Sequence, residues 1–367
     1  MNGEAKKDAD VTIIFVTMIL VGLGLVMVLS ASYVFAQETR GDAYFFLKRQ
    51  AVWAVLGIFL MFILSKFNYH NFRKLSLPFL GISTFLLLIL MIPGVGVEIN
   101  EAVRWINVAG FSIQPSEFTK LAIIIFTAVS MSRKSLDLEN FWSSSFVPII
   151  AAGGSFLLIM LQPDFGTGMV LFGTTILIII VAGIPMRHLG LMILSVIPVG
   201  IALIVSAPYR LARLTSFVDP WADARGAGWQ IIQSLYALAP GGIFGMGLGR
   251  SRQKLYYLPE PHNDFIFAII GEELGLIGTV SVIILFAIFV WRGLRIAANA
   301  PDSFGRLLAS GIVFVIGIQV LVNIGVVTGS IPVTGINLPL ISAGGSSLLF
   351  NLCGIGILLN ISRHTVK

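Results

Sequence analysis

The stretch DFIFAIIGEELGLIGTVSVIILFAIFVW, Asp264–Trp291, decides the fold class. From Phe265 onward it is apolar apart from two adjacent glutamates. An apolar helix of about 20 residues crosses the roughly 30 Å hydrocarbon layer and satisfies its own backbone hydrogen bonds there. We therefore expect a membrane-spanning helix over residues 264–291, entered through an acidic residue.

Nine further apolar runs extend this reading to the whole chain. Only 11% of the 367 residues are charged and 56% are hydrophobic, whereas a soluble domain carries about 25% charged residues. The runs are continuous, unlike the short alternating segments of a transmembrane barrel. The sequence predicts an all-α, polytopic membrane protein with ten transmembrane helices, forming a single domain over 1–367. The expected spans are 11–31, 50–65, 76–93, 116–131, 146–162, 167–184, 189–207, 264–291, 305–328 and 344–361.

Basic residues predict the orientation. With the N-terminus inside, the inner segments hold thirteen Lys and Arg residues, and the short outer loops hold four. Because cytoplasmic loops carry the excess of Lys and Arg, both termini are expected in the cytoplasm. Segment 208–263 is then a large extracellular loop between helices 7 and 8. The net charge of +6 suits anionic membrane lipids, and no motif predicts a nucleic-acid partner.

The long loop contains three unusual pieces. GWQIIQSLYALA, 228–239, has apolar residues at helical spacing, which predicts an amphipathic helix at the membrane interface. PGGIFGMGLG, 240–249, is rich in glycine, which permits positive φ and close backbone approach. RSRQK, 250–254, follows with a basic cluster that could hold a phosphate or contact anionic headgroups.

Ionisable residues at the ends of the spans are candidate site residues, because such groups usually face a cavity or a partner. Glu117 and Lys120 are three residues apart and can form either a structural ion pair or part of a cavity. Asp164 lies at a Pro and Gly helix break, where it can cap a helix. Arg104 beside Trp105 could anchor an interface or grip a phosphate.

Asp264 and the glutamates that follow it fall on different faces of the expected helix. Glu272 lies eight residues beyond Asp264, about 12 Å deeper and about 80° round the axis. We expect Asp264 at the outer mouth, and Glu272 and Glu273 as partners within the membrane that position helices. An N-cap role for Asp264 does not explain the neighbouring His262 and Asn263, which follow two prolines and the basic cluster.

Several motifs together resemble the SEDS family, the shape, elongation, division and sporulation group that includes FtsW, RodA and SpoVE. The resemblance covers essentially the whole chain, and the sequences of the motifs are most similar to those of the FtsW and SpoVE branch. One departure is visible: where members often have a small residue and two basic or polar residues before the Trp, this chain has Ala102, Val103 and Arg104, so only Arg104 can serve as the basic contact. The motifs are RWINVAGFSIQPSEFTKLA, QPDFGTG, SAPYR, SLYA, GMGLG, PEPHNDFIF and NIGVVTGSIPVTGINLPLISAGGSS.

The resemblance implies a peptidoglycan glycosyltransferase in the bacterial cytoplasmic membrane. Such an enzyme polymerises lipid II on the outer face, in cell division, sporulation or shape maintenance, together with a class B penicillin-binding protein. The essential acid of the family falls on Asp264, and its Glu and Lys of the fourth span fall on Glu117 and Lys120. Two other functions stay open, a lipid II flippase, for which Glu272, Glu273, Gln319 and Asn323 are the only hints, and a non-catalytic scaffold for the penicillin-binding protein.

The expected mechanism assigns a role to each candidate. Asp264 is the general base and a tentative ligand of Mg or Mn, and no other cofactor is expected. The small residues Gly311, Gly317 and Gly325 of the ninth span are a candidate face for the partner's helix. The predicted substrate-binding residues are Arg104, Glu117, Lys120, Asp164, Arg210, Arg213, Arg250, Arg252, Lys254 and His262.

Overall fold

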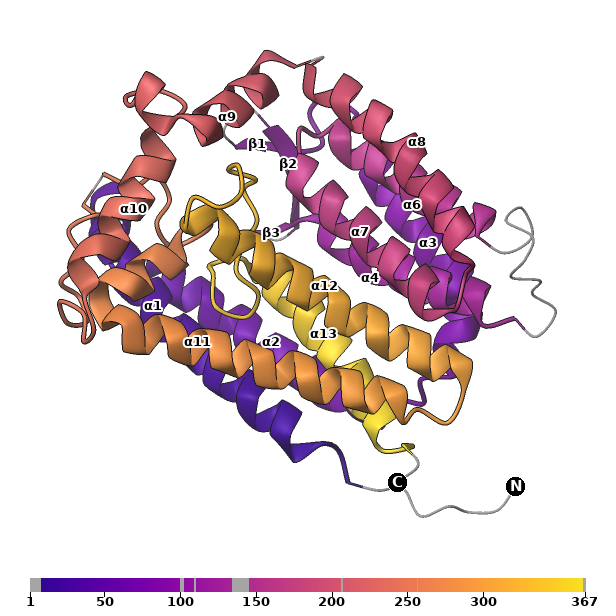
Figure 1. Cartoon of the computed structure of the whole chain (residues 1–367). Coiled ribbons are helices and arrows are strands. Elements are labelled where there is room, and N and C mark those ends of the chain that lie inside the picture. Colours follow the sequence, from indigo (N-terminus) through magenta and orange to yellow (C-terminus); the bar gives the residue numbers. More distant parts are fainter. Residues whose placement is uncertain are drawn as a thin grey trace.

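A computed structural model describes residues 8–99, 102–108, 110–133, 145–205, 207–255 and 257–365. Each of the ten expected ranges contains a helix, and Figure 1 shows these helices side by side in one bundle. In order they are α1 (Val11–Arg40), α2 (Phe45–Lys66), α3 (Asn71–Ile89), α4 (Pro115–Met131), α6 (Phe146–Met160), α7 (Phe165–Val181), α8 (Met186–Val205), α11 (Ile266–Ala298), α12 (Ser303–Val327) and α13 (Gly345–Ser362).

Within the described residues, six of these helices are long and apolar enough to cross a membrane: α1, α2, α3, α11, α12 and α13. The helices α6 and α7 are apolar but shorter. Among these six, α13 has the largest buried share, with 83% of its residues buried, whereas only 22% of the most apolar window of α11 is buried. A predominantly helical, multi-pass membrane protein is therefore confirmed, while ten crossings stay a prediction.

The two ends of the chain lie at the same end of the bundle (Figure 1). Asp10 caps α1 by accepting from the Ile13 amide at 3.1 Å, and its own amide donates to Ser362 Oγ at 3.1 Å. Arg292 Nε of α11 donates to Asp10 Oδ2 at 2.6 Å. The start of α1, the end of α11 and the end of α13 are thus tied together.

The long loop is largely helical. It contains α9 (Pro208–Val218), a short 3₁₀ helix (Pro220–Asp223) and α10 (Trp229–Gly241), so the helix predicted over 228–239 is confirmed. Ile231, Ile232 and Ala237 of α10 are buried, and Ser234 Oγ donates to the Val327 carbonyl at 2.8 Å. The helix therefore packs on the bundle with one face and exposes another.

The prediction missed one element, a small antiparallel sheet in the loop between α3 and α4. Its strands are β1 (Val97–Ile99), β2 (Ala102–Val108) and β3 (Phe111–Ile113), with Ile106 opposite Ile113. A signal was present in the sequence, because RWINV and FSI are rich in the β-branched and aromatic residues that strands favour and are separated by an Ala-Gly pair. This sheet places Arg104 at the same end of the bundle as α9 (Figure 1).

The glycine-rich segment completes a break in α11. At Gly275 the backbone has φ 64° and ψ −159°, which interrupts the helix. The amides of Met246 and Gly247 donate to the carbonyls of Glu272 and Glu273 at 2.9 and 3.0 Å. On the far side of the break, the Leu276 amide donates to Gly242 at 2.9 Å. The loop thus satisfies backbone groups that the break leaves open, as irregular backbone at membrane depth requires.

The glycines of the predicted partner face in the ninth span pack to different degrees against this chain itself. An added Cβ at Gly311 would lie 2.6 Å from Ile124 Cγ2, and one at Gly325 would lie 2.6 Å from Ile331 Cδ1. Gly317 has Val290 of α11 at 3.5 Å from the same position. These glycines allow close packing within the chain, and a contact with another protein's helix stays a prediction.

Candidate active site at the outer mouth of α11

The segment from His262 to Asp264 is fixed by hydrogen bonds to its backbone. Asn323 Nδ2 of α12 donates to the Asp264 carbonyl at 2.7 Å and to the Ile336 carbonyl at 2.7 Å. Ser342 Oγ donates to the Asn263 carbonyl at 2.7 Å, and the Ala343 amide donates to the His262 carbonyl at 2.9 Å. These contacts hold Asp264 on α12 and on the irregular segment between α12 and α13.

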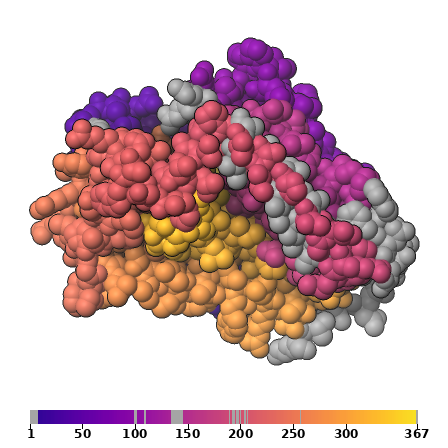
Figure 2. All heavy atoms as spheres, turned by 45° about the horizontal axis from the view of Figure 1, so that its top comes forward, coloured from indigo at the N-terminus to yellow at the C-terminus, as the bar shows by residue number. Residues whose placement is uncertain are grey.

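That irregular segment reaches the surface beside the long loop. Figure 2 shows yellow atoms of the C-terminal part of the chain exposed between the red and salmon loop and the orange helices. A Cβ at Gly335, where φ is 73°, would lie 3.5 Å from Asp264 Oδ2. Asp264 as a whole is half-buried, and the backbone at Gly335 lies close to its carboxyl group.

The surroundings of Asp264 favour its protonated form. Burial, followed by the charges of Glu260 and Asp164, raises the pKa of Asp264 from 3.8 to about 7. Arg104 and Arg213 oppose this increase in pKa, so both guanidinium groups act on the carboxyl group electrostatically. A carboxyl group with a pKa near neutrality is suited to take a proton from a substrate.

Arg104 and Arg213 are held on separate elements beside this carboxyl group. Arg104 of β2 donates through Nε to the Gln162 carbonyl at 3.0 Å and through Nη2 to the Pro163 carbonyl. Arg213 of α9 donates to the Val333 carbonyl at 3.4 Å. Two guanidinium groups near an acid–base residue form a site that suits a phosphate leaving group.

Asp164 caps a helix, which is one of the two roles predicted for it. Its Oδ1 accepts from the Thr167 amide at 3.1 Å at the start of α7, and its Oδ2 accepts from Gln114 Nε2 at 3.2 Å. It also influences Asp264 through its charge. The structure thus supports a role in tuning the site, while a direct contact with substrate stays a prediction.

Three predicted substrate-binding residues have other contacts. His262 is buried with its ring 4.3 Å from that of Phe46, and burial lowers its pKa to about 4. Lys254 is buried and pairs with Glu273 Oε1 at 2.8 Å. Arg210 lies over the Tyr209 ring at 5.2 Å. The neutral, enclosed His262 and the paired Lys254 serve packing in this structure rather than an open anion site.

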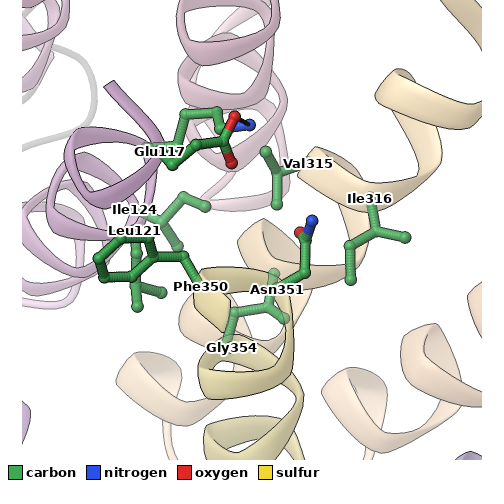
Figure 3. Close-up of a pocket in the computed structure, with 10 residues that line it drawn as sticks. Glu117, Leu121, Ile124, Val315, Ile316, Phe350, Asn351 and Gly354 are labelled. Atoms are coloured by element: carbon green, nitrogen blue, oxygen red, sulfur yellow. Dashed lines mark hydrogen bonds and ion pairs between the residues drawn. The ribbon is translucent and has the colours of Figure 1, made fainter. Parts of the chain in front are cut away.

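Glu117 and Lys120 form a buried ion pair of 2.9 Å on α4. They line a cavity of about 20 Å³ between α4, α12 and α13. Figure 3 shows the Asn351 amide pointing toward the Glu117 carboxylate across this space. The cavity has room for about one water molecule, so the pair shapes the bundle and does not itself accommodate a sugar.

Glu272 and Glu273 organise the turn that leads to the site. Glu272 accepts from Ser251 Oγ and from the Arg252 amide at 2.7 Å. Glu273 accepts from the Ser251 amide at 3.2 Å and from Lys254 Nζ at 2.8 Å. The prediction that these glutamates are structural partners is confirmed, and the partner is mainly the loop rather than another helix.

The sequence analysis missed the residues that fix Asp264 through its backbone. From the sequence, Asn323 was only a hint of a flippase route, and Ser342 was only part of a family motif. Gln50 belongs with them, because its Nε2 donates to the Ser342 carbonyl at 3.0 Å and its Oε1 accepts from Gly344. Buried polar residues inside apolar runs were the available signal.

The predicted metal contact at Asp264 has no supporting donor set. Across the described residues, no three His, Cys, Asp or Glu side chains gather in a way that could hold a metal ion. Any cation there would need most of its ligands from substrate oxygens. The role of Mg or Mn stays a prediction, and the mechanism below uses no metal.

Fold and site together define a multi-pass membrane protein with a carboxyl group of raised pKa and two arginines that act on it electrostatically. The chain belongs to the cell cycle protein family of FtsW, RodA and SpoVE, whose profile matches residues 10–367. It is 49% identical over 361 residues to stage V sporulation protein E of Bacillus subtilis (strain 168), with 98% of each chain covered. It is 42% identical over 356 residues to a probable peptidoglycan glycosyltransferase FtsW of Geobacter sp. (strain M18), with 97% of each covered.

Solved structures agree in fold. A chain from a peptidoglycan synthase complex that coordinates polymerization and crosslinking superposes with a TM-score of 0.77 at 30% identity, over 97% of this chain and 98% of that one. The rod shape determining protein RodA of Thermus thermophilus superposes with a TM-score of 0.72 at 28% identity, over 98% of each chain. The predicted family, and the FtsW and SpoVE branch within it, are confirmed.

Proposed function

We propose that this protein is a peptidoglycan glycosyltransferase that polymerises lipid II into glycan strands at the outer face of the bacterial cytoplasmic membrane. The observation that carries the proposal is Asp264, a carboxyl group with a pKa near 7, fixed by its backbone and flanked by Arg104 and Arg213. The FtsW relatives named as peptidoglycan glycosyltransferases support the same activity.

In the proposed step, Asp264 removes the proton from the sugar hydroxyl of the acceptor. The hydroxyl oxygen forms a bond to the anomeric carbon of the donor as the bond from that carbon to the pyrophosphate oxygen breaks. The electron pair of that bond leaves with the pyrophosphate, whose increased charge Arg104 and Arg213 stabilise. The proton on Asp264 then passes to solvent, which its partial exposure permits.

The orientation follows from the same proposal. The start of α11, which follows Asp264 by two residues, lies at the end of the bundle opposite the start of α1 and the end of α13 (Figure 1), so an outer active site puts both termini in the cytoplasm. The basic residues near the ends of the spans support this direction. The large loop, 208–263, is then extracellular, between the seventh and eighth of ten spans.

The proposed partner is a class B penicillin-binding protein that crosslinks the strands. Support comes from the synthase complex that coordinates polymerization and crosslinking, which this chain resembles along its length. Gly311 is buried against Ile124 and Ile178 of this chain, whereas Gly317 and Gly325 are half-buried, so a contact of the partner's helix with this face stays a prediction.

Three of the four polar residues that suggested a flippase make structural contacts. Glu272 and Glu273 hold the 251–254 turn, and Asn323 holds the Asp264 and Ile336 carbonyls. The alternative that this protein is a non-catalytic scaffold predicts that a substitution of Asp264 leaves its function intact, as long as the complex with the transpeptidase still assembles.

The deciding experiment gives lipid II to the purified protein with its co-expressed transpeptidase and resolves the products by size. Wild-type protein should make glycan strands, and Asp264→Asn in an assembled complex should not. Translocation of lipid II in liposomes without any glycan product would contradict the proposed polymerase, and so would normal polymerisation by the Asp264→Asn complex.

A further inference from the structure

Polymerisation of a lipid-linked sugar, on which this inference rests, brings two pyrophosphates to one site. The donor's pyrophosphate is bonded to the reacting carbon, so it must lie next to Asp264. The acceptor's pyrophosphate is separated from its reacting hydroxyl by the whole disaccharide. The protein therefore needs a second anion site at a distance from Asp264 and at the level of the lipid headgroups.

The membrane depth of α11 can be worked out from its inner end. Trp291 is 59% exposed, and Arg295 lies over its ring at 5.7 Å, an aromatic and basic pair typical of an interface. About 20 residues cross the roughly 30 Å hydrocarbon layer. Counting back from Trp291 puts the outer boundary near Glu272, just before the break at Gly275.

A basic turn is fixed at this depth. The Arg252 amide donates to Glu272 at 2.7 Å, and the Ser251 amide donates to Glu273 at 3.2 Å. Both carboxylates are buried, at 1% and 0% exposure, so the backbone of the turn is held on rigid acceptors. The side chains of Arg250 and Arg252 are exposed instead.

The charge of this turn favours an anion. Lys254 neutralises Glu273 at 2.8 Å, while Glu272 is occupied by the Ser251 hydroxyl and the Arg252 amide. In the part of the chain that the structure describes, neither Arg250 nor Arg252 has an ion pair with a carboxylate. Two guanidinium groups without an ion-pair partner, held on a rigid turn, suit the two negatively charged phosphates of a pyrophosphate.

An apolar surface adjoins the turn. Phe244 is 80% exposed and Ile243 is 59% exposed, in the segment that pairs with the break in α11. The Ile277 amide donates to the Ile243 carbonyl at 3.2 Å, and Leu276 and Ile277 are also exposed. A prenyl chain attached to a pyrophosphate on the turn would find this surface directly beneath it.

We propose that the turn bearing Arg250 and Arg252 binds the pyrophosphate of the acceptor, and that Arg104 and Arg213 bind that of the donor. Asp264 precedes Glu272 by eight residues, most of them helical, which places it about 10 Å further out along α11. The acceptor disaccharide then spans from the turn to the base. The turn contacts α11 through Glu272, and α1 through Ser30, to which Lys254 Nζ donates at 3.3 Å. In Figure 1, α9 and β2 lie on the other side of the irregular segment between α12 and α13 from α1 and α11.

The test separates the two substrates by chemistry. A donor-only lipid II has its terminal 4-hydroxyl replaced by hydrogen, and an acceptor-only lipid II has a methylene group in place of the anomeric oxygen, so that its pyrophosphate cannot leave. Formation of the lipid-linked tetrasaccharide is followed in the complex with the transpeptidase, with each analogue varied in turn. The variants are Arg250→Gln with Arg252→Gln, Arg213→Gln, and the exposed Arg225→Gln as a charge control.

The double variant should raise the KM for the acceptor-only analogue at least about tenfold, as expected for lost charge-assisted hydrogen bonds, and change the KM for the donor-only analogue less than twofold. Arg213→Gln should show the reverse, and Arg225→Gln should match wild type. An unchanged acceptor KM in the double variant, or an effect on the donor alone, overturns the assignment.

Equilibrium binding gives a second measurement that needs no turnover. In nanodiscs, the acceptor-only analogue should bind the Asp264→Asn protein about tenfold less tightly once Arg250 and Arg252 are replaced, with the same unfolding temperature. Equal binding refutes the subsite. Weakened binding by a protein whose wild type makes no glycan would refute the polymerase and leave the subsite standing, so the two failures can be told apart.

Discussion

Replacing Asp264 with Asn should stabilise the protein while abolishing its proposed activity. The surroundings of the carboxyl group raise its pKa from 3.8 to about 7, so the folded state binds this proton more tightly than the unfolded state does. Ionised Asp264 therefore costs folding free energy, and the cost grows between pH 4 and pH 7 and is complete above pH 7. The difference in pKa sets a ceiling of about 4 kcal/mol, which solvent at this half-buried residue reduces.

Asparagine avoids this cost because it does not ionise. The unfolding temperature of Asp264→Asn should exceed that of wild type at pH 8, exceed it less at pH 5.5, and match it near pH 4. Scanning fluorimetry in detergent or nanodiscs measures this, with Asp219→Asn as a control at an exposed residue of the same loop. A difference in unfolding temperature that does not increase with pH would contradict the assigned environment.

The activity of the same variant tests the other half of the argument. A general base typically contributes about 10²- to 10⁴-fold, so Asp264→Asn should lose at least about 100-fold in polymerisation rate. Wild-type rate should rise with pH through about 7, because the ionised form is the base. A rate that stays flat from pH 5.5 to pH 8.5, or a variant that keeps a tenth of wild-type activity, would refute Asp264 as the base.

Three further substitutions test the supporting structure. Asn323→Asp removes the two 2.7 Å donations to the Asp264 and Ile336 carbonyls, and it should lower kcat about tenfold or more with little change in KM; an equal loss from Gln319→Leu would indicate general damage instead. Gly245→Ala puts a Cβ 2.2 Å from the Glu273 carbonyl, so it should destabilise the protein by about 2 kcal/mol or more, whereas Gly249, with similar φ and nothing within 4 Å, should tolerate alanine better. Lys120→Met should cost about 3–5 kcal/mol by leaving Glu117 buried without its 2.9 Å partner, and adding Glu117→Gln should recover part of it in thermal unfolding.

The helices could be predicted because each needs only its own sequence. A run of apolar residues must form a helix in lipid, whatever lies next to it. The small sheet was not predicted, because its strands are short. Strands β2 and β3 pair across a turn at Gly110 that was read as loop. The break at Gly275 escaped for a different reason, since its partner, the segment from Gly241 to Gly247, lies about 30 residues earlier in the chain.

The types of residue in the site could be predicted from the sequence, but their arrangement in space could not. Asp264 stood out as an acid at the mouth of an apolar helix, and the arginines stood out as phosphate ligands. From the sequence, however, all of the basic candidates were assigned to one substrate-binding site, because distance along the chain does not reveal distance in space. The structure places Arg104 and Arg213 near Asp264, engages Lys254 with Glu273, and leaves Arg250 and Arg252 on a separate turn.

The two glutamates inside α11 explain how a long loop can carry part of an active site. Each one holds the loop twice, since the carbonyl of Glu272 accepts from Met246 while its carboxylate accepts from Arg252. Glu273 does the same with Gly247 and Lys254. The free carbonyls exist only because α11 breaks at Gly275, where an unbroken helix would use them for its own amides. The break therefore lets two helical residues anchor the turn both through their carbonyls and through their carboxylates. The turn lies at the depth proposed for the acceptor's pyrophosphate, about 10 Å from Asp264, the proposed base that the acceptor's sugar has to reach.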